Sequence, residues 1–343
     1  MDTRCDIGSL SGEQIAEAFG ALGLPRFRAG QVVRWLYGRG ATDFDSMSDL
    51  PESLRQELSA RYRIGGAEVT ARQVSADGTR KYLVRFDDGT SVETVGLPDG
   101  DRLTVCFSTQ AGCAMGCTFC ATGRAGFTRD LTGGEMVRQV LLVADDFGRR
   151  VSNVVAMGQG EPFANYDATL AALRFMNSED GPGIGARHIT VSTCGILAGL
   201  RRFAAEPEQF TLAVSLHSAV QATRDRLMPG VRGVPLKALR EALVAYSEHT
   251  GRRPTLEYAL ATGVNDTDAE LGALVAFARG MLAHVNLIPV NPVADAGLER
   301  SVAARVSLFR DTLLQAGVET SVRVERGTDI DAACGQLRQR HEA

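Results

Sequence analysis

The sequence predicts an α/β protein, a partial (βα)6-type TIM-like barrel preceded by a small N-terminal helical domain. Two observations predict this class. From about residue 102 onward, short apolar runs alternate with helix-length amphipathic segments, as is typical of parallel strands joined by helical crossovers. Before that point the chain shows helix-like segments within residues 11–63 and one hairpin-like segment. A doubly wound open sheet is the rival architecture.

The composition is that of an ordinary globular chain, with 44% hydrophobic and 23% charged residues. No run of about 18 apolar residues is present, so we expect no membrane span. The N-terminal stretch MDTRCDIGSL lacks the apolar core of a signal peptide. We therefore expect a cytoplasmic protein. The formal net charge of −4 gives no overall basic character of the kind that nucleic-acid-binding chains usually show.

The chain divides into three expected parts. Residues 1–65 form a helical accessory domain, because SGEQIAEAFGALG begins with a capping serine, and RAGQVVRWLYGRG and LPESLRQELSARY carry apolar residues at helical spacing. Residues 66–101 form a connecting hairpin, KYLVRFDDGTSVETVGL, with DDG at its turn. Residues 102–343 form the barrel and end in a loop that carries Cys334.

Seven apolar segments predict the barrel strands: LTVCFS, NVVAMG, HITVST, LAVSLH, TLEYAL, VNLIPV and TSVRVE. In such barrels, active sites gather at the C-terminal ends of the strands. Polar or reactive residues follow most of these segments here. A cysteine cluster follows the first, and GQGEP, STCG, SLHS, NPV and RGTDIDAACGQ follow later ones. Their repetition predicts one shared pocket.

Three cysteines within eight residues form the strongest motif. Cys113, Cys117 and Cys120 have the spacing C-x3-C-x2-C. Three thiolates can hold three irons of a [4Fe–4S] cluster and leave the fourth iron open, whereas clusters held by protein alone have four cysteines. Zinc is the main competitor, but a closed zinc site needs a fourth ligand, and the loop contains no histidine. The remaining possibility is three buried cysteines without a metal.

Phe119 stands just before the last of these cysteines, and C-x3-C-x-Phe-C after the first strand of a βα barrel resembles the radical S-adenosylmethionine (radical SAM) superfamily. The resemblance implies a [4Fe–4S] cluster, one per chain, whose open iron binds the amino and carboxylate groups of S-adenosyl-L-methionine (SAM). It also implies that an electron from the cluster cleaves SAM to methionine and a 5′-deoxyadenosyl radical.

Further motifs resemble the RlmN/Cfr-type family of RNA adenine methyltransferases over nearly the whole chain. They are FRAGQVVRWLY, VETVGLPDGDRLTVCFSTQAGCAMGCTFCATG, MGQGEP, HITVSTCG, LAVSLHS, LEYAL, VNLIPVNP and DIDAACGQL. The resemblance is greatest to the dual-specificity branch, which methylates C2 of adenine 2503 in 23S rRNA and of adenine 37 in tRNA. It therefore implies an enzyme with 23S rRNA and tRNA as its partners.

The family chemistry implies roles for two cysteines outside the cluster and for one acid. C2 of adenine has no lone pair with which to attack the SAM methyl group. The family uses two SAM molecules, of which the first methylates the thiol matched by Cys334 and the second removes a hydrogen from that S-methyl group. The resulting carbon adds to C2 and joins the RNA to the enzyme. Cys106 matches the thiol that frees the product as a Cys106–Cys334 disulfide, and Glu93 matches the base that accepts the C2 proton.

The resemblance also implies a SAM-binding set at successive strand ends. This set is Gly160, Glu161, Ser192, Ser215, Leu216, His217 and Asn291. A cellular reducing system must serve the cluster and the disulfide, with a flavodoxin-like donor as one candidate, and we expect a monomer. Without the resemblance, these residues would be ordinary caps and turns, and Glu93 an ordinary strand carboxylate.

Arginines mixed with aromatics are candidates for RNA contact, because aromatic rings stack on bases and guanidinium groups bind phosphate. A packed core with a solvated rim is the alternative. In the N-terminal domain these candidates are Arg26, Phe27, Arg28, Arg34, Trp35, Tyr37 and Arg39, and near the C-terminus they are Arg323 and Arg326.

Two residues depart from the family pattern. Gln159 stands in MGQGEP where members commonly have Met, and Cys194 stands in STCG where cysteine is unusual. We expect Cys5 and Cys194 to be small buried hydrophobes. Three other functions stay open: Cfr-type C8 methylation with the same cysteines, an iron–sulfur or SAM-binding protein without methyl transfer, and a zinc-dependent barrel hydrolase.

Overall fold

One sheet of ten strands organises the fold in the computed structural model, which describes residues 4–10, 12–291, 293 and 297–337. The strand order is β14-β13-β12-β11-β10-β9-β6-β5-β4-β3. Seven neighbouring strands run parallel: β6 (Arg102–Cys106), β9 (Asn153–Ala156), β10 (Ile189–Thr193), β11 (Thr211–Ser215), β12 (Thr255–Leu260), β13 (His284–Pro289) and β14 (Glu319–Val322). Each of them overlaps one of the seven segments that the apolar pattern predicts.

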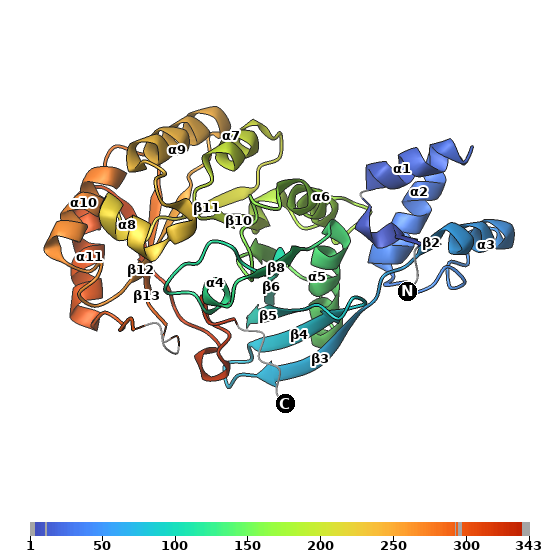
Figure 1. Ribbon diagram of the computed structural model, residues 1–343, viewed down its shortest axis with the longest axis horizontal. Helices are drawn as coiled ribbons and strands as arrows, with labels where there is room; N and C mark the ends of the chain where they lie inside the picture. Colours follow the sequence, from blue (N-terminus) through green and yellow to red (C-terminus); the bar gives the residue numbers. More distant parts are fainter. Residues whose placement is uncertain (1–3, 11, 292, 294–296, 338–343) are drawn as a thin grey trace.

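Helical crossovers join the parallel strands, and the longer ones lie along the outer side of the curved sheet (Figure 1). The longer ones are α5 (Gly133–Phe147), α6 (Tyr166–Asn177), α7 (Leu197–Ala205), α9 (Leu236–Thr250), α10 (Asp268–Ala278) and α11 (Ala303–Gln315), and the short ones are α4 (Ala121–Ala125) and α8 (Gln221–Leu227). Strands β6 and β14 are not neighbours in the sheet, so the barrel is open. The predicted partial βα barrel is thereby confirmed, and the doubly wound sheet is wrong.

Three further strands extend this sheet beyond β6. They are β3 (Ala67–Val74), β4 (Arg80–Phe86) and β5 (Ser91–Asp99), and they pair antiparallel in sequence order before β5 pairs with β6. The expected hairpin forms between β4 and β5, and the Phe86 N–H donates to the Thr90 carbonyl at 2.9 Å across the DDG turn. The segment is therefore a continuation of the barrel sheet, and β5 brings Val95 opposite Cys106.

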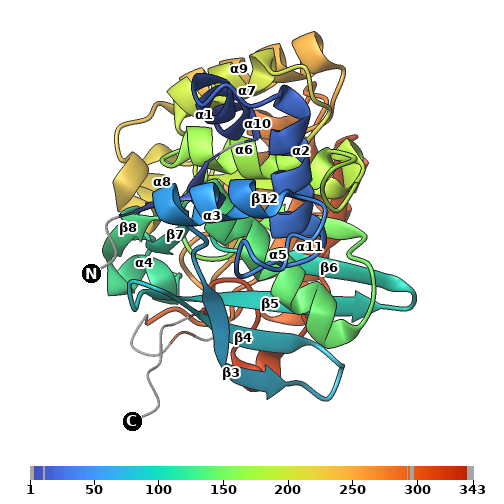
Figure 2. The ribbon, with the colours of Figure 1, turned by 90° about the vertical axis from the view of Figure 1, so that its right-hand side faces the viewer.

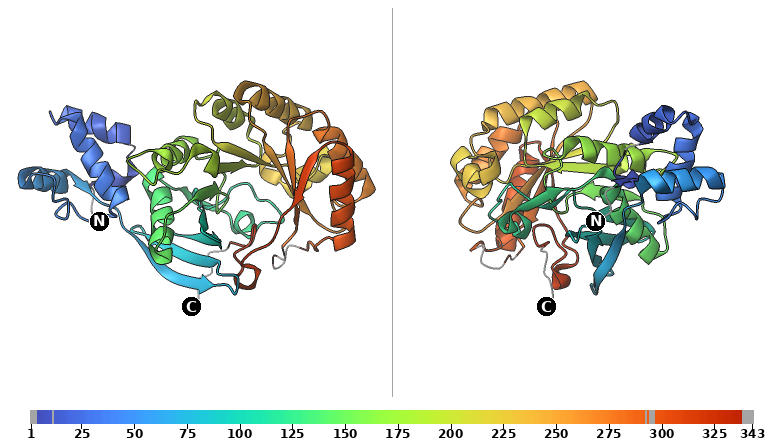
Figure 3. Two further views of the ribbon diagram at one scale, coloured as in Figure 1. Left: turned by 180° about the vertical axis from the view of Figure 1, so that it is seen from behind. Right: turned by 45° about the vertical axis from the view of Figure 1, so that its right-hand side comes forward.

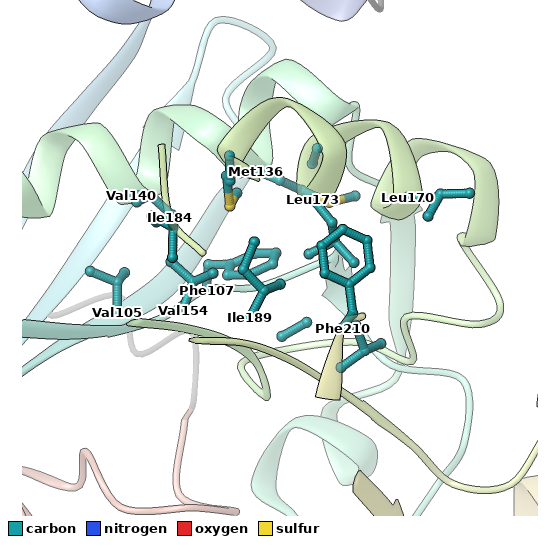
Figure 4. Packing of buried hydrophobic residues seen from close by; sticks show 14 of the residues in the cluster. Val105, Phe107, Met136, Val140, Val154, Leu170, Leu173, Ile184, Ile189 and Phe210 are labelled. Atoms are coloured by element: carbon teal, nitrogen blue, oxygen red, sulfur yellow. The ribbon is translucent and has the colours of Figure 1, made fainter. Parts of the chain in front are cut away.

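The core between the sheet and its first helices is apolar and closely packed (Figure 4). Phe107, Val154 and Ile189 from the sheet region lie beneath Met136 and Leu173 from α5 and α6, and all five side chains are buried. A capping box begins α5, since Thr132 accepts the Glu135 N–H and Glu135 accepts the Thr132 N–H. This rigid layer supports the strand ends where the polar motifs lie.

The N-terminal helices are α1 (Gly12–Ala21), α2 (Arg26–Val33), a π-helical turn (Arg34–Gly38) and α3 (Glu52–Arg61). They project from one side of the barrel and face the viewer in Figure 2. Gly134 on α5 allows the close approach, because a Cβ there would lie 1.6 Å from the Gly8 carbonyl oxygen. The Tyr37 hydroxyl donates to the same carbonyl at 2.7 Å.

In the described part of the chain, none of the helices combines the length and the hydrophobicity that a membrane span requires.

The C-terminal segment after β14 runs back beneath the barrel toward β3, β4 and α4 (Figure 3). The Ala121 N–H donates to the Gly335 carbonyl at 2.7 Å, and the Ser75 hydroxyl donates to the Asp329 carboxylate at 2.6 Å. Ala121 follows Cys120 directly. The segment therefore holds Cys334 beside the three-cysteine loop, although more than 200 residues separate the two in the chain.

Candidate active site

Two adjoining cavities lie at the C-terminal ends of the parallel strands. The cluster-loop cavity, of about 170 Å³, is lined by Cys113, Cys117 and Cys120. The thiol-pair cavity, of about 320 Å³, is lined by Cys106 and Cys334. Cys334 lines both of them, so it stands on a shared wall. The other shared residues are Cys120, Met157, Gly158, Ile288, Asn291, Arg323 and Gly335.

The three loop cysteines suit an iron–sulfur cluster. The pKa of Cys113 is raised to about 11, mainly by burial and to a smaller extent by the neighbouring Cys120. Burial is also the main cause that raises the pKa values of Cys117 and Cys120. Within the described ranges, no group of three His, Cys, Asp or Glu side chains converges on a point where one metal ion would bind. The three cysteines of a [4Fe–4S] cluster bind different irons, so this donor set fits the cluster.

Most of the expected SAM-binding residues line the cluster-loop cavity. They come from the ends of different strands, as the sequence pattern predicts: Gly160, Glu161, Ser192, Ser215, His217 and Asn291. Leu216 is different, because its side chain is fully buried in the hydrophobic core and lines neither cavity. Leu216 therefore supports this wall from behind, and its expected direct contact with SAM has no support in the geometry.

Gly160 and Glu161 form a tightly built corner of this cavity. Gly160 has φ 102°, and a Cβ there would lie 2.6 Å from the Gln110 Cβ, so only glycine fits. The buried Glu161 carboxylate accepts the Phe163 N–H through Oε1 at 3.0 Å and the Cys194 N–H through Oε2 at 2.7 Å. Burial raises its pKa, and these backbone donors lower it. The carboxylate thus joins the end of β9 to the end of β10.

We expect Glu161→Gln to destabilise the protein and to weaken SAM binding. Glutamine has one acceptor oxygen, so either the Phe163 or the Cys194 N–H loses its partner, at a cost of about 1–3 kcal/mol. Denaturant unfolding and equilibrium SAM binding would measure both effects. The matched control is Glu179→Gln at an exposed position, with a change within about 0.5 kcal/mol. Equal stability of the two variants would contradict this assignment.

His217 adopts the left-handed backbone conformation, with φ 53°. The Ala259 N–H donates to its Nδ1 at 2.9 Å, so the ring proton of the neutral imidazole lies on Nε2. Burial, followed by the charge of Arg224, lowers its pKa to about 3, which keeps the ring neutral. The Phe119 ring meets it edge-on, with centroids 4.4 Å apart. The aromatic residue of the cysteine motif therefore fixes the end of β11.

Asn291 connects the two cavities. Its Nδ2 donates to the Cys334 carbonyl at 3.0 Å. Its Oδ1 is buried and accepts no hydrogen bond from the part of the chain that the structure describes, so it can accept one from a ligand. One side chain thus holds the Cys334 loop and keeps a free acceptor beside the cavity. The residue that follows it, Pro292 of the NPV motif, lies outside the described residues.

Cys106 and Cys334 are free thiols in one cavity. Cys106 is buried and Cys334 is exposed. Burial raises the pKa of Cys106 to about 12, with a smaller increase from Cys334 and a decrease from Arg323. The pKa of Arg323 is itself raised, first by Cys334. The Arg323 guanidinium lies 4.0 Å from the carboxylate of the buried Glu257. The acid therefore partly balances the positive charge that lies near both thiols.

Glu93 lines neither cavity, but it lies on the same face of β5 as Val95 and Leu97, which line the thiol-pair cavity. Its carboxylate is buried and forms an ion pair with Lys81 at 3.4 Å. The structure therefore places Glu93 one side chain beyond the cavity wall. Its role as a base stays a prediction.

Of the aromatic candidates for RNA contact in the N-terminal domain, Phe27 is exposed and Tyr37 is buried. Phe27 is 58% exposed with Arg28 over its ring at 4.8 Å, and Arg39 lies over Trp35 at 4.2 Å. Tyr37 is instead buried and packs on the barrel, so it cannot stack on a base.

The other candidates for RNA contact have protein partners or no described interaction. Arg34 pairs with Asp180 at 3.2 Å. Arg326 pairs with Asp99 at 3.1 Å at the edge of the thiol-pair cavity, which it lines together with Arg323. Arg26 begins α2, and the structure gives it no hydrogen bond or ion pair among the described residues.

Two expectations about isolated cysteines are corrected or refined. Cys5 is exposed on a short strand, so its expected burial is wrong. Cys194 is buried as expected, but it also lines the cluster-loop cavity beside Glu161.

Gln159, the other departure from the family pattern, is buried, and its Oε1 has no hydrogen-bond partner within the described residues.

Sequence patterns missed the buried acid Glu257, which lines the cluster-loop cavity. A charged residue inside the apolar strand segment TLEYAL was the one feature that could have identified it. They also missed Met157, which lines both cavities, because a methionine at a strand end is most often a core residue.

Comparison with known proteins identifies the class of protein to which the chain belongs. The Radical SAM superfamily model matches residues 107–277, and the model of the ribosomal RNA large subunit methyltransferase N-terminal domain matches residues 5–64. The barrel, the three-cysteine loop and the first of these matches together define a radical SAM protein.

Individual relatives show which family of radical SAM proteins the chain resembles. The chain is 48% identical to a probable dual-specificity RNA methyltransferase RlmN of Synechococcus elongatus, over 93% of this chain and 89% of the relative. It is 46% identical to the protein of the same description from Symbiobacterium thermophilum, over 98% and 92% of the two chains. A crystal structure of a radical SAM methyltransferase from Sphaerobacter thermophilus matches with TM-score 0.90 and 45% identity, over 97% of this chain and 99% of that chain. The chain belongs to the RlmN family.

Proposed function

We propose that this protein is a radical SAM RNA methyltransferase that methylates C2 of adenine in 23S rRNA and tRNA. The observation that carries the proposal is the position of Cys334. It stands on the wall shared by the cavity of the three cluster cysteines and the cavity of Cys106. A thiol in this position can take a methyl group on one side and meet an RNA base on the other. The printed names of the relatives supply the RNA substrate class.

Cys113, Cys117 and Cys120 would hold the [4Fe–4S] cluster, which, when bound, supplies the electron that cleaves SAM to methionine and a 5′-deoxyadenosyl radical. Glu161, Ser192, Ser215 and His217 surround the same cavity and orient SAM. The apolar side chains around them exclude water, which protects a carbon radical from side reactions.

Cys334 carries the methyl group in this proposal. Its thiol accepts a methyl from one SAM, and the S-methyl group then loses a hydrogen atom to the radical formed from a second SAM. The carbon radical adds to C2 of adenine, and the radical adduct then loses one electron, for which the cluster would be a suitable acceptor, and passes its C2 proton to Glu93. The target base must leave its stack to reach this buried site. The Cys106 thiolate then attacks the Cys334 sulfur, the bond between that sulfur and the methylene carbon breaks, and a Cys106–Cys334 disulfide forms. The released carbon keeps the electron pair of the broken bond and takes up one proton, which completes the methyl group of the product.

We expect the resolution step to accelerate with rising pH. Burial raises the pKa of Cys106 to about 12, so the thiol is protonated at neutral pH, and its reactive thiolate fraction grows about tenfold for each pH unit below that value. Decay of the RNA–enzyme adduct in a single turnover should therefore be about tenfold faster at pH 8 than at pH 7. The 5′-deoxyadenosine formed in the same samples controls for radical generation. An adduct lifetime independent of pH would contradict this role.

Two other functions make different predictions. C8 methylation would use the same cysteines, and a protein that only binds a cluster would form no methylated RNA. Mass spectrometry of nucleosides from cells with and without the gene separates the three functions. The proposal expects 2-methyladenosine to disappear from both rRNA and tRNA in the deletion strain. Loss of 8-methyladenosine instead, or no change, would contradict it.

We infer the remaining partners from this chemistry. A low-potential one-electron donor, for which a flavodoxin-like protein is suited, must reduce the cluster, and a thiol reductant must reopen the Cys106–Cys334 disulfide. Exposed Phe27 and half-buried Arg28 on α2 support RNA contact by the N-terminal helices. Ribosomal and transfer RNA as substrates favour a cytoplasmic location. The two cavities are lined by residues of one chain, which is compatible with a monomer.

A further inference from the structure

Arg224 on α8 is a fully buried arginine behind the wall of the cluster-loop cavity. Its exposed fraction is 0%. Its Nη2 donates to the carbonyls of Cys194 at 2.6 Å and Ser215 at 3.3 Å, and both of these residues line the cavity. The guanidinium therefore lies directly behind the strand ends that surround the proposed SAM site.

The charge of Arg224 is not matched by an ion pair in the part of the chain that the structure describes. Burial lowers the pKa of Arg224, although the charge of Asp225 on the same helix acts to raise it. None of the described carboxylates lies within 4.0 Å of its guanidinium. Its Nε and Nη1 are buried and make no hydrogen bond to any residue that the structure describes. A guanidinium stays protonated even when buried. An uncompensated buried charge is costly, and proteins retain one where a ligand or metal centre compensates it.

The three-cysteine loop is held against α8 and the turn that follows it. The Thr118 N–H donates to the Leu227 carbonyl at 2.9 Å, and the Gly230 N–H donates to the Met115 carbonyl at 2.8 Å. A Cβ at Gly230 would lie 2.5 Å from the Met115 Cα, so the two backbones are in direct contact. The helix that carries Arg224 is therefore built onto the loop that carries the cluster ligands.

The interaction of Arg224 with these ligands is electrostatic. The guanidinium donates to the Cys194 and Ser215 carbonyls, and both of these residues line the same cavity as Cys117, so its charge acts across the wall of the cavity that the cluster would occupy. Three thiolates give the bound [4Fe–4S] cluster a net negative charge, which increases when the cluster takes up one electron. A fixed positive charge nearby stabilises the reduced state more than the oxidised state.

We propose that Arg224 is the buried counter-charge of the iron–sulfur cluster and raises its reduction potential. The electron enters the cluster from a low-potential one-electron donor, no bond forms or breaks at the guanidinium, and Arg224 keeps its proton. Arg224 acts through the field at the cluster and is not a catalytic residue. This proposal rests on the cluster-bearing function described above.

The test compares two substitutions in the anaerobically reconstituted full chain. Arg224→Gln keeps a donor for the Cys194 carbonyl but removes the charge, whereas Arg224→Lys keeps the charge. Arg226→Gln, at an exposed position two residues further along α8, is the matched control. A mediator titration followed by EPR gives the midpoint potential of each cluster. Iron content and thermal unfolding of the same samples show whether each variant is folded and loaded.

We expect Arg224→Gln to disfavour reduction about tenfold, which for one electron is a midpoint about 59 mV more negative. Arg224→Lys and Arg226→Gln should stay close to the wild type. Loss of the cluster from a folded Arg224→Gln protein, with retention in Arg224→Lys, would also support the proposal. Equal potentials in all four proteins would overturn it, as would failure of both Arg224 variants to fold.

The outcome for the wild type keeps this proposal distinct from the proposed function. A wild-type protein that binds no [4Fe–4S] cluster would overturn both. A wild-type protein with a cluster that cleaves SAM, and a potential unaffected by the charge at position 224, would overturn the role of Arg224 alone.

Discussion

Replacing Cys334 by alanine is expected to abolish methyl transfer to RNA altogether. Cys334 lines both cavities, and no other cysteine among the described residues does so except the cluster ligand Cys120. Without its thiol there is no atom between the SAM site and the RNA site to carry the methyl group. The measurement is intact-protein mass spectrometry after incubation with SAM, which should show one added methyl group on the wild type and none on the variant.

Two controls make this result specific to Cys334. The iron content and the visible absorption of the variant should equal those of the wild type, because Cys334 is not one of the three cluster cysteines. Cys5→Ala removes an exposed thiol outside the two cavities and should leave methyl loading intact. A Cys334→Ala protein that still methylates RNA at an appreciable rate would contradict the carrier role.

Replacing Cys106 by alanine is expected to trap the enzyme on its RNA. The radical addition depends on Cys334, so it proceeds. Apart from Cys334, the cluster ligand Cys120 is then the only thiol among the described residues that lines the thiol-pair cavity. The covalent adduct should therefore accumulate to a large fraction of the enzyme, while turnover falls by several orders of magnitude. Denaturing gel electrophoresis with labelled RNA would show the adduct as a protein band that carries the label.

The origin of this adduct can be checked with a double variant. Cys106→Ala combined with Cys334→Ala should form no crosslink, because the carrier thiol is missing. Digestion of the trapped complex should locate the RNA on the peptide that contains Cys334. Full turnover by Cys106→Ala without any crosslink would show that another group resolves the adduct.

Local patterns were sufficient to locate the strands and to select the candidate residues of the site. The apolar segments are short and bounded by polar residues, so each of the seven parallel strands could be located from the sequence. The cysteine spacing restricted the possible metal centres, because few of them use three thiolates on one loop. Since parallel strands end at one edge of the sheet, Ser192, Ser215 and Asn291 could be expected to lie together.

Long-range contacts could not be predicted from periodicity. The sequence ATRDRLMPG reads as an ordinary charged helix, and only the fold shows that Arg224 is buried behind the cavity while Arg226 is exposed. The buried position of Leu216 could not be predicted for a related reason. Strand β11 ends at Ser215, and His217 then adopts the left-handed backbone conformation, so these two residues line the cavity whereas Leu216 between them is in the core.

EPR spectroscopy of the anaerobically reduced wild-type protein, with and without SAM, tests the central claim most directly. A cluster held by Cys113, Cys117 and Cys120 alone has one iron available to SAM. We therefore expect one [4Fe–4S] cluster per chain and a spectrum that changes when SAM is added, together with release of 5′-deoxyadenosine. A protein that binds no cluster, or one whose cluster spectrum is the same with and without SAM, would contradict the account.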